Sequence, residues 1–420
     1  MMRKLSRIIF RHSKLCSLIL LSILWLLGSH SVLLEDGEDY VENIKNIKHP
    51  QFSNPADVNP PSSDFINLGT IIINLQNTDK LDQKLLLSIE KTFNSIFRFS
   101  SGTPLHFIIV TDKRSLGCVS NALSNMITKD VATHAVLNQF WDWRRRKGIP
   151  PLRFSFVNID DITNINTEFV AALKNHNIQG NDAAEEKYAA DLFYVAPLYH
   201  LAFLSMEKMI FIDSTDLVFL SDVKDLEEQF VNMEDEAVME IGLDLSPHYL
   251  THLNHFIKTN PETIFGLPGR YQGLNTGVVL FNLEKMRKSV EYNNLLTKHS
   301  VDNLFRIFEM KVTVGDQDWF TILSYHHPNL ITILPCQYNT QLSLQYWTTH
   351  RTIFHSYHHC ASPPKIFHCN GCGPKPEHCG GQPARVAEYR KYIHLFIQVI
   401  NIQDFWAYLG DLELIQQSNH

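Results

Sequence analysis

Apolar runs of strand length alternate with longer amphipathic segments along most of the chain. The first strand-like run covers residues 69–75, a helical period follows over 80–99, a second strand over 105–111, and another helix from Val119. The pattern continues with strands at 153–157, 209–212, 238–241 and 278–281 and an amphipathic helix over 181–204. Such alternation is typical of parallel strands joined by crossover helices. It predicts an α/β fold with a central, mostly parallel sheet of the nucleotide-binding type.

The N-terminal pattern is different. Five basic residues, Arg3, Lys4, Arg7, Arg11 and Lys14, precede an apolar run over 15–27 that continues weakly through 32–34. Basic residues stay on the cytoplasmic side of a membrane segment, and no small-residue cleavage site stands out, which favours an uncleaved signal-anchor over a removed signal peptide. We therefore expect a cytoplasmic tail (1–14), a transmembrane segment (15–34), a polar, proline-containing stem (35–64) and a lumenal domain (65–420). We therefore also expect a single-pass type II membrane protein of the endoplasmic reticulum or the Golgi.

Composition narrows the class. With 44% hydrophobic and 19% charged residues, the chain can bury a large core. A net charge of -7 gives no general attraction to nucleic acid, and the short basic run 144–147 suits a solvated helix end. Five of the seven cysteines lie between Cys336 and Cys379, which predicts disulfides in an oxidising lumen. A zinc site is the alternative, with Cys369, Cys372, His378 and Cys379 as ligands.

Two segments carry candidate metal ligands. Asp213 and Asp216 follow the apolar run 209–212, and closely spaced carboxylates at a strand end can hold the divalent cation that binds a diphosphate. The alternative is a turn with capping aspartates. His368 ends another apolar stretch and is followed by a glycine-rich segment with Lys375. A histidine can complete a carboxylate metal site, while glycine amides and a lysine can hold phosphate.

Two further segments carry candidate sugar-binding residues. Asp316, Gln317 and Asp318 follow Gly315 at an expected strand-to-helix junction, where they can face a sugar or form the first turn of a helix. A polar turn with Asn275, Thr276 and Gly277 leads into the strand 278–281. Glycine permits close backbone approach there, and an asparagine offers both a donor and an acceptor to hydroxyl groups.

The order and spacing of these segments resemble glycosyltransferase family 8, the retaining transferases with a GT-A fold. The strand 71–75 resembles the family's nucleotide-binding start, 212–216 its D-x-D, 275–277 its N-[ST]-G, 316–318 its D-Q-D, and His368 its late metal-ligand histidine. The resemblance runs from about residue 68 to 376. The D-x-D is one residue longer here, so Asp213 or Ser214 takes its first place, and we favour Asp213 because a hydroxyl is a poor substitute for a carboxylate.

The resemblance also implies roles for individual residues. Asp213, Asp216 and His368 would hold Mn²⁺. Asn74, Leu75 and Gln76 would lie beside the uridine, with Thr215 also among the donor-binding residues. Asn275, Thr276, Gly277 and Gln317 would surround the donor sugar and the acceptor, and Asp316 or Gln317 would stabilise the sugar cation. Lys375 would approach the diphosphate, although it sits one place later than the family's pattern puts it.

The activity that the resemblance implies is transfer of xylose from UDP-xylose, with retention, to a xylosyl-glucose O-linked to EGF repeats such as those of Notch. Addition of the preceding xylose is the nearest alternative. A catalytically silent lumenal binding protein is another, motivated by the altered D-x-D. The sequence gives no sign of a nucleic-acid partner and leaves a homodimer open.

Overall fold

A computed structural model describes residues 50–59, 62, 64–73, 75–77, 80–100, 102–128, 152–176, 193–341, 343, 346, 349–368 and 370. The expected tail, anchor and most of the stem lie outside this part, as do the basic run 144–147, the alternative zinc ligands and all of residues 371–420. Within the described part, none of the helices has the length and apolar character needed to cross a membrane.

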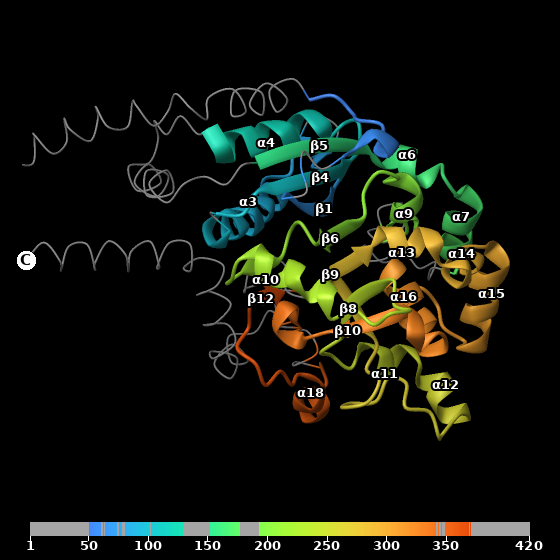
Figure 1. Cartoon of the computed structure of the whole chain (residues 1–420). Helices are drawn as coiled ribbons and strands as arrows, with labels where there is room; N and C mark the ends of the chain where they lie inside the picture. The colour runs from blue at the N-terminus through green and yellow to red at the C-terminus, as the bar shows by residue number, and fades with distance from the viewer. Residues whose placement is uncertain are drawn as a thin grey trace, which may run out of the picture. The chain divides into compact units, whose positions relative to one another are not determined.

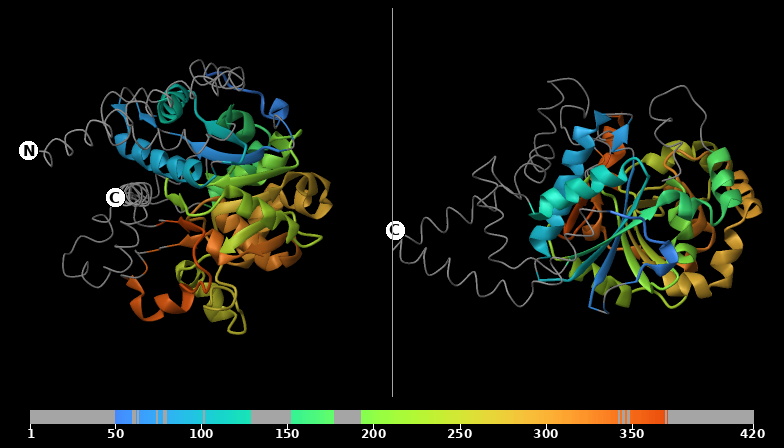
Figure 2. Two further views of the ribbon diagram at one scale, coloured as in Figure 1. Left: turned by 60° about the vertical axis from the view of Figure 1, so that its left-hand side comes forward. Right: turned by 90° about the horizontal axis from the view of Figure 1, so that it is seen from above.

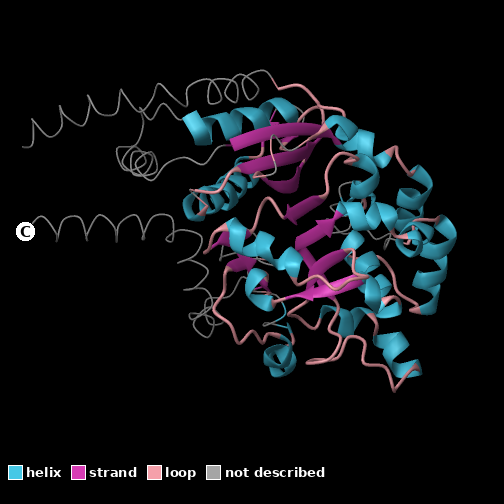
Figure 3. Cartoon of the chain, in the orientation of Figure 1, coloured by secondary structure: helices cyan, strands magenta, loops and turns pink. Residues whose placement is uncertain are grey.

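A seven-stranded sheet forms the centre of the described part (Figures 1 and 3). In spatial order its strands are β10 (Ile331–Leu334), β8 (Met239–Leu243), β9 (Leu274–Asn282), β6 (Lys208–Ile212), β1 (Ile66–Ile72), β4 (Leu105–Thr111) and β5 (Leu152–Asn158). Four of its six neighbouring pairs are parallel, and only the two pairs that involve β9 are antiparallel. The predicted mostly parallel α/β sheet is confirmed.

Helices cover both faces of this sheet (Figure 2). One face carries α3 (Gln83–Phe99) and α4 (Leu116–Thr128), and Phe93 of α3 stacks on Phe107 of β4 at 5.0 Å between ring centroids. The other face packs against a set of helices that share the main hydrophobic core. They are α6 (Ile159–Thr163), α7 (Thr167–Asn175), α9 (Tyr199–Ala202), α13 (Leu283–Lys288), α14 (Val290–Leu295), α15 (Lys298–Ile307) and α16 (Asp316–His326). Alternate side chains of the strands serve the two faces, as the pleat of a strand requires.

A second, three-stranded sheet joins β11 (Thr340–Gln341), β12 (Ile366–His368) and β7 (Leu217–Phe219). β12 runs antiparallel to β7 and parallel to β11. Cys336, in the short helix η6 (Cys336–Tyr338), forms a disulfide with Cys360, which lies shortly before β12. This bond confirms a disulfide between two of the five cysteines in the 336–379 region.

The smaller elements complete the described part. They are η1 (Pro55–Asp57), β2 (Gln76–Asn77), β3 (Lys80–Leu81), η3 (Ala196–Leu198), α10 (Val223–Glu227), η4 (Glu228–Val231), α11 (His248–His252), α12 (Asn254–Thr259), η5 (Pro328–Leu330) and α18 (Arg351–Tyr357).

Three expectations need correction. The helix predicted over 181–204 is not continuous in its described part, because Pro197 falls in the separate 3₁₀ turn η3 and α9 ends at Ala202. The folded part begins before the expected residue 65, since the backbone N–H of Ser53 donates to the Phe156 carbonyl and Val58 is buried in the core. The polar turn expected at Asn275, Thr276 and Gly277 is wrong, because all three residues already lie in β9.

Candidate active site

The candidate metal ligands meet where the two sheets join. β6 ends at Ile212, residues 213–216 follow, and β7 begins at Leu217. Because His368 of β12 pairs with Leu217, the antiparallel register places it beside Asp216. The His368 Nε2 lies 3.3 Å from the Asp216 Oδ1. One ligand atom from each of Asp213, Asp216 and His368 lies within 4.8 Å of the other two.

The four side chains of the longer D-x-D segment, residues 213–216, make different contacts. Ser214 points away from the cluster and donates from its hydroxyl to the Ile71 carbonyl at 2.9 Å. Thr215 donates to the Asp213 Oδ1 from both its backbone N–H (2.9 Å) and its hydroxyl (2.8 Å). Asp213 and Asp216 are therefore the two acids that face His368, as the sequence favoured, and Ser214 is committed elsewhere. Thr215, expected near the donor, orients Asp213.

The electrostatics of the cluster fit a cation. Burial raises the pKa of Asp213, the neighbouring Asp216 raises it further, and His368 offsets part of this rise. Burial lowers the pKa of His368, but Asp216, Asp213 and Asp244 outweigh it and leave that pKa raised. The buried Asp216 Oδ1 makes no hydrogen bond within the described part of the chain. Two carboxylates and one imidazole are ligands that Mn²⁺ accepts, so these residues fit the expected ion.

Gly277 makes room for the histidine. The Asp213 backbone N–H donates to the Gly277 carbonyl, which places Gly277 of β9 directly beside the acids. A Cβ built on Gly277 would lie 2.3 Å from Cε1 and 2.5 Å from Nδ1 of His368. Nothing larger than glycine fits here without moving the imidazole. The glycine of the N-[ST]-G segment thus has a steric reason rather than a turn-forming one.

Asn275 and Thr276 connect this cluster to the D-Q-D segment. The Asn275 Oδ1 accepts from the Gly277 N–H at 3.1 Å, which orients the asparagine side chain along the strand. The Thr276 N–H donates to the Gln317 Oε1 at 3.2 Å. The N-[ST]-G and D-Q-D segments, about forty residues apart in the sequence, therefore lie in direct contact.

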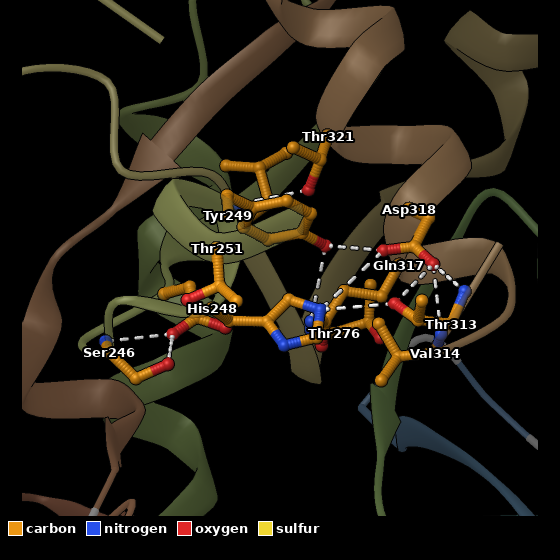
Figure 4. Close-up of polar contacts among 12 residues, drawn as sticks. Ser246, His248, Tyr249, Thr251, Thr276, Thr313, Val314, Gln317, Asp318 and Thr321 are labelled. Carbon is orange, nitrogen blue, oxygen red and sulfur yellow. Dashed lines mark hydrogen bonds and ion pairs between the residues drawn. The ribbon is translucent and has the colours of Figure 1, made fainter. Parts of the chain in front are cut away.

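The D-Q-D residues occupy the first turn of α16, as the capping interpretation predicted. The cap is Gly315, whose φ of 75° suits glycine. Gln317 donates from Nε2 to the Tyr249 hydroxyl at 3.3 Å (Figure 4). Burial raises the pKa of Asp316 well above its ordinary value, although backbone N–H groups donate to its carboxyl.

Asp318 has a structural environment. It is fully buried and accepts hydrogen bonds from the Tyr249 hydroxyl (3.0 Å) and from the backbone N–H groups of Thr313 (2.5 Å) and Val314 (2.8 Å) (Figure 4). Burial raises its pKa to about 6 despite these donors. The second acid of the segment holds the preceding loop and Tyr249 in place.

Three buried residues in this region were not singled out from the sequence. Tyr249 bridges Gln317 and Asp318. Asp244, just beyond β8, accepts from Ser246, and burial raises its pKa to about 7. Asn339 contacts His368 and Asn275. Only Asp244 had a sequence signal, because it follows the predicted strand 238–241 as Asp213 follows 209–212.

The remaining predicted residues are placed in part. Asn74 and Lys375 lie outside the described residues. The Leu75 side chain is fully buried, and its backbone N–H donates to the Ser115 hydroxyl at 3.0 Å. Gln76 begins the short strand β2, which pairs with β3. The Leu75 carbonyl accepts from the Asp82 backbone N–H at 2.9 Å, so both backbone polar groups of Leu75 already have partners.

The fold and this cluster define a class, and comparison with known proteins names it. The profile of glycosyl transferase family 8 matches residues 116–378, and the chain belongs to that family. It is 32% identical over 194 residues to xyloside xylosyltransferase 1 of Mus musculus and, equally, of Homo sapiens. This confirms the resemblance that the motifs indicated.

The match with these relatives is partial. It covers 45% of this chain and 49% of each of them, so the chain spans about half the length of the curated relatives it matches. Glucoside xylosyltransferase 1 of Rattus norvegicus is 24% identical over 139 residues, which is 32% of this chain and 30% of that protein. The crystal structure of mouse xyloside xylosyltransferase 1 in its apo form superposes with a TM-score of 0.61 over 74% of this chain and 99% of that one, at 24% identity. The GT-A-type fold is thereby confirmed.

Proposed function

We propose that this chain is a manganese-dependent, retaining α-1,3-xylosyltransferase. It would move xylose from UDP-xylose to the xylose of a xylosyl-glucose O-linked to EGF repeats of Notch-type proteins. The observation that carries the proposal is the meeting of Asp213, Asp216 and His368 within 4.8 Å. This cluster adjoins the Asn275–Gly277 and Gln317 contacts in a family 8 chain that resembles xyloside xylosyltransferase 1.

The residues of this site would have different roles in the reaction. A manganese ion held by Asp213, Asp216 and His368 would neutralise the charge that grows on the leaving UDP. Gln317, fixed through Thr276 and Tyr249, would present its amide to the developing sugar cation. Asn275 uses Oδ1 for Gly277, which leaves its side-chain nitrogen to donate to sugar hydroxyls.

The environment of the two D-Q-D acids supports attack by the acceptor hydroxyl on the face that UDP leaves. Burial raises the pKa of Asp316 well above its ordinary value, which disfavours the charged, nucleophilic form of its carboxyl. Asp318 is enclosed by donors and fully buried. Neither acid offers an accessible carboxylate, and front-face transfer with retention needs none.

A lumenal location fits the same proposal. The expected signal-anchor would orient the domain into the endoplasmic reticulum or Golgi, where its EGF-repeat acceptors pass. The Cys336–Cys360 disulfide suits an oxidising compartment. A type II topology predicts that protease added to intact microsomes leaves the catalytic domain protected.

The test is transfer from a panel of UDP-sugars, with Mn²⁺ or EDTA, to an EGF repeat that carries O-glucose alone or xylosyl-glucose. Xylose transfer only to the xylosylated repeat supports the proposal. Transfer to the glucose form would move the assignment to the preceding step, an alternative suggested by the similarity to rat glucoside xylosyltransferase 1. Binding of UDP-xylose without any manganese-dependent turnover would indicate a silent binding protein.

A further inference from the structure

His368 is held from behind by a buried asparagine. Asn339 follows η6 and is 1% exposed, and its Oδ1 lies 3.0 Å from the His368 Nδ1. The other ring nitrogen, Nε2, faces Asp216. A histidine that binds a metal through one nitrogen commonly donates from the other to an acceptor that fixes its tautomer and orientation.

The neighbours of Asn339 decide which way its amide points. Its second terminal atom lies 3.1 Å from the Asn275 backbone carbonyl and 3.0 Å from the Asn275 Oδ1. A backbone carbonyl only accepts hydrogen bonds, so this atom is the Nδ2 donor. The Oδ1 must then face His368, and because an amide oxygen carries no proton, the His368 Nδ1 must donate.

We propose that Asn339 is the positioning residue that sets the tautomer of His368, with the proton on Nδ1 and the Nε2 lone pair directed at the metal site. The same amide ties His368 to Asn275, so the metal ligand and the expected sugar-binding asparagine are held by one side chain. This inference rests on the metal site of the proposed function. It assigns a role to a residue that is not among the three candidate metal ligands.

The surroundings keep Asn339 in this position. Disulfide-linked Cys336 begins the turn before it, and the Asn339 backbone N–H donates to the Cys336 carbonyl at 3.1 Å. Beyond it, β11 pairs with β12, so that Gln341 lies opposite His368. Gly242 of β8 lies beside it, and a Cβ built there would be in ordinary van der Waals contact with the Asn339 Cβ at 3.4 Å. The amide is therefore fixed from both sides before any ion binds.

The test measures Mn²⁺ affinity rather than transfer alone. Free Mn²⁺ is followed by electron paramagnetic resonance during titration of the full-length chain, with UDP present and no acceptor. Asn339→Leu removes both hydrogen-bonding ends at similar size, and its Mn²⁺ Kd should rise about 10- to 100-fold. Asn339→Asp keeps an acceptor for the His368 Nδ1–H but loses the donor to Asn275. Asn339→Asp should therefore bind Mn²⁺ almost as tightly as the wild type. Its KM for UDP-xylose should be higher than that of the wild type, because Asn275 has lost its hydrogen-bond donor.

A matched control exists outside the site. Asn293 also pairs with a buried histidine: it accepts from the His200 Nε2 at 3.0 Å and donates to the carbonyls of Met286 (2.8 Å) and Ser289 (2.7 Å). Asn293→Leu should lower the melting temperature but leave the Mn²⁺ Kd unchanged. A merely structural role for Asn339 would give the same result at both positions.

The outcomes separate this inference from the proposed function. Folded Asn339→Leu with wild-type Mn²⁺ affinity, or Asn339→Asp as weak as Asn339→Leu, would overturn the positioning role. If Asn339→Leu fails to fold, Asn339→Asp against the wild type decides, and loss of its Mn²⁺ binding overturns the inference. A wild-type chain that binds Mn²⁺ but transfers no xylose contradicts the proposed function alone, whereas one that binds no Mn²⁺ contradicts both.

Discussion

Glu240 is a buried acid outside the candidate site, and its replacement by glutamine gives a quantitative test of the structure. It lies in β8 between Met239 and Ile241, which face the main core, so its side chain points to the opposite face of the sheet. It is 1% exposed, and its Oε1 makes no hydrogen bond within the described residues. Burial raises its pKa from 4.5 to about 7.

The direction in which the free energy of unfolding changes with pH depends on whether the folded or the unfolded chain keeps the Glu240 proton. Below pH 4.5 the acid is protonated in both the folded and the unfolded chain, and it contributes nothing to the pH dependence. Between pH 4.5 and about 7 the unfolded chain loses the proton while the folded chain keeps it, so the free energy of unfolding falls as pH rises. Above that window the loss is complete, at about 3 kcal/mol for a shift of this size.

Glu240→Gln mimics the protonated acid and should remove this loss. Urea unfolding, followed by the fluorescence of the buried Trp319, should show variant and wild type alike near pH 4.5. At pH 8 the variant should be more stable by about 3 kcal/mol. The same change at the exposed Glu228 is the control and should not follow this profile. A stability difference at Glu240 that is the same at both pH values would refute the reasoning.

Four further substitutions test the site and its support. Asp216→Asn and His368→Ala should each lower xylose transfer more than about 100-fold, with unchanged circular dichroism, because each removes a metal ligand; near-normal activity in either would contradict the metal assignment. Gly277→Ala should weaken Mn²⁺ binding by forcing the His368 ring aside, and a crystal structure with the ring unmoved would argue against that cause. Cys336→Ser should cost about 3 kcal/mol of unfolding free energy, as expected for opening a loop of this length; a loss well below 1 kcal/mol in urea unfolding would show that the loop is held by packing alone.

Much of the fold was accessible from the sequence because strands buried on both faces leave long apolar runs. All seven residues of β4 are buried, and the strand was predicted with the bounds that it has in the structure. The helix predicted over 181–204 was too long because its apolar period continues through Pro197. Proline has no backbone N–H to donate inside a helix, and Pro197 lies in the separate 3₁₀ turn η3. The start of the packed chain was missed because its buried residues, Pro55 and Val58, stand in a polar segment without a sustained apolar period.

The candidate site could be predicted from the sequence only for those of its residues that lie at the ends of strands. Asp213 and His368 both follow apolar runs, and that local signal suggested them. Asn339 has no such signal, since its role depends on partners 29 and 64 residues away. Gly277 was expected to permit close approach, but only the folded structure, in which β12 pairs with β7, shows that the approaching group is the His368 ring.

The extra residue in the D-x-D segment was the reason to consider a silent binding protein, and its placement weakens that alternative. A one-residue insertion in a regular strand would turn every following side chain to the other face. Here the added length is taken up in the bend between β6 and β7, where Ser214 turns to the Ile71 carbonyl and Thr215 folds back onto Asp213. Both acids consequently stay on the side of His368, within reach of one ion. A catalytically silent chain would have no need to preserve that geometry through a longer loop, so the altered motif favours an adapted metal site over a lost one.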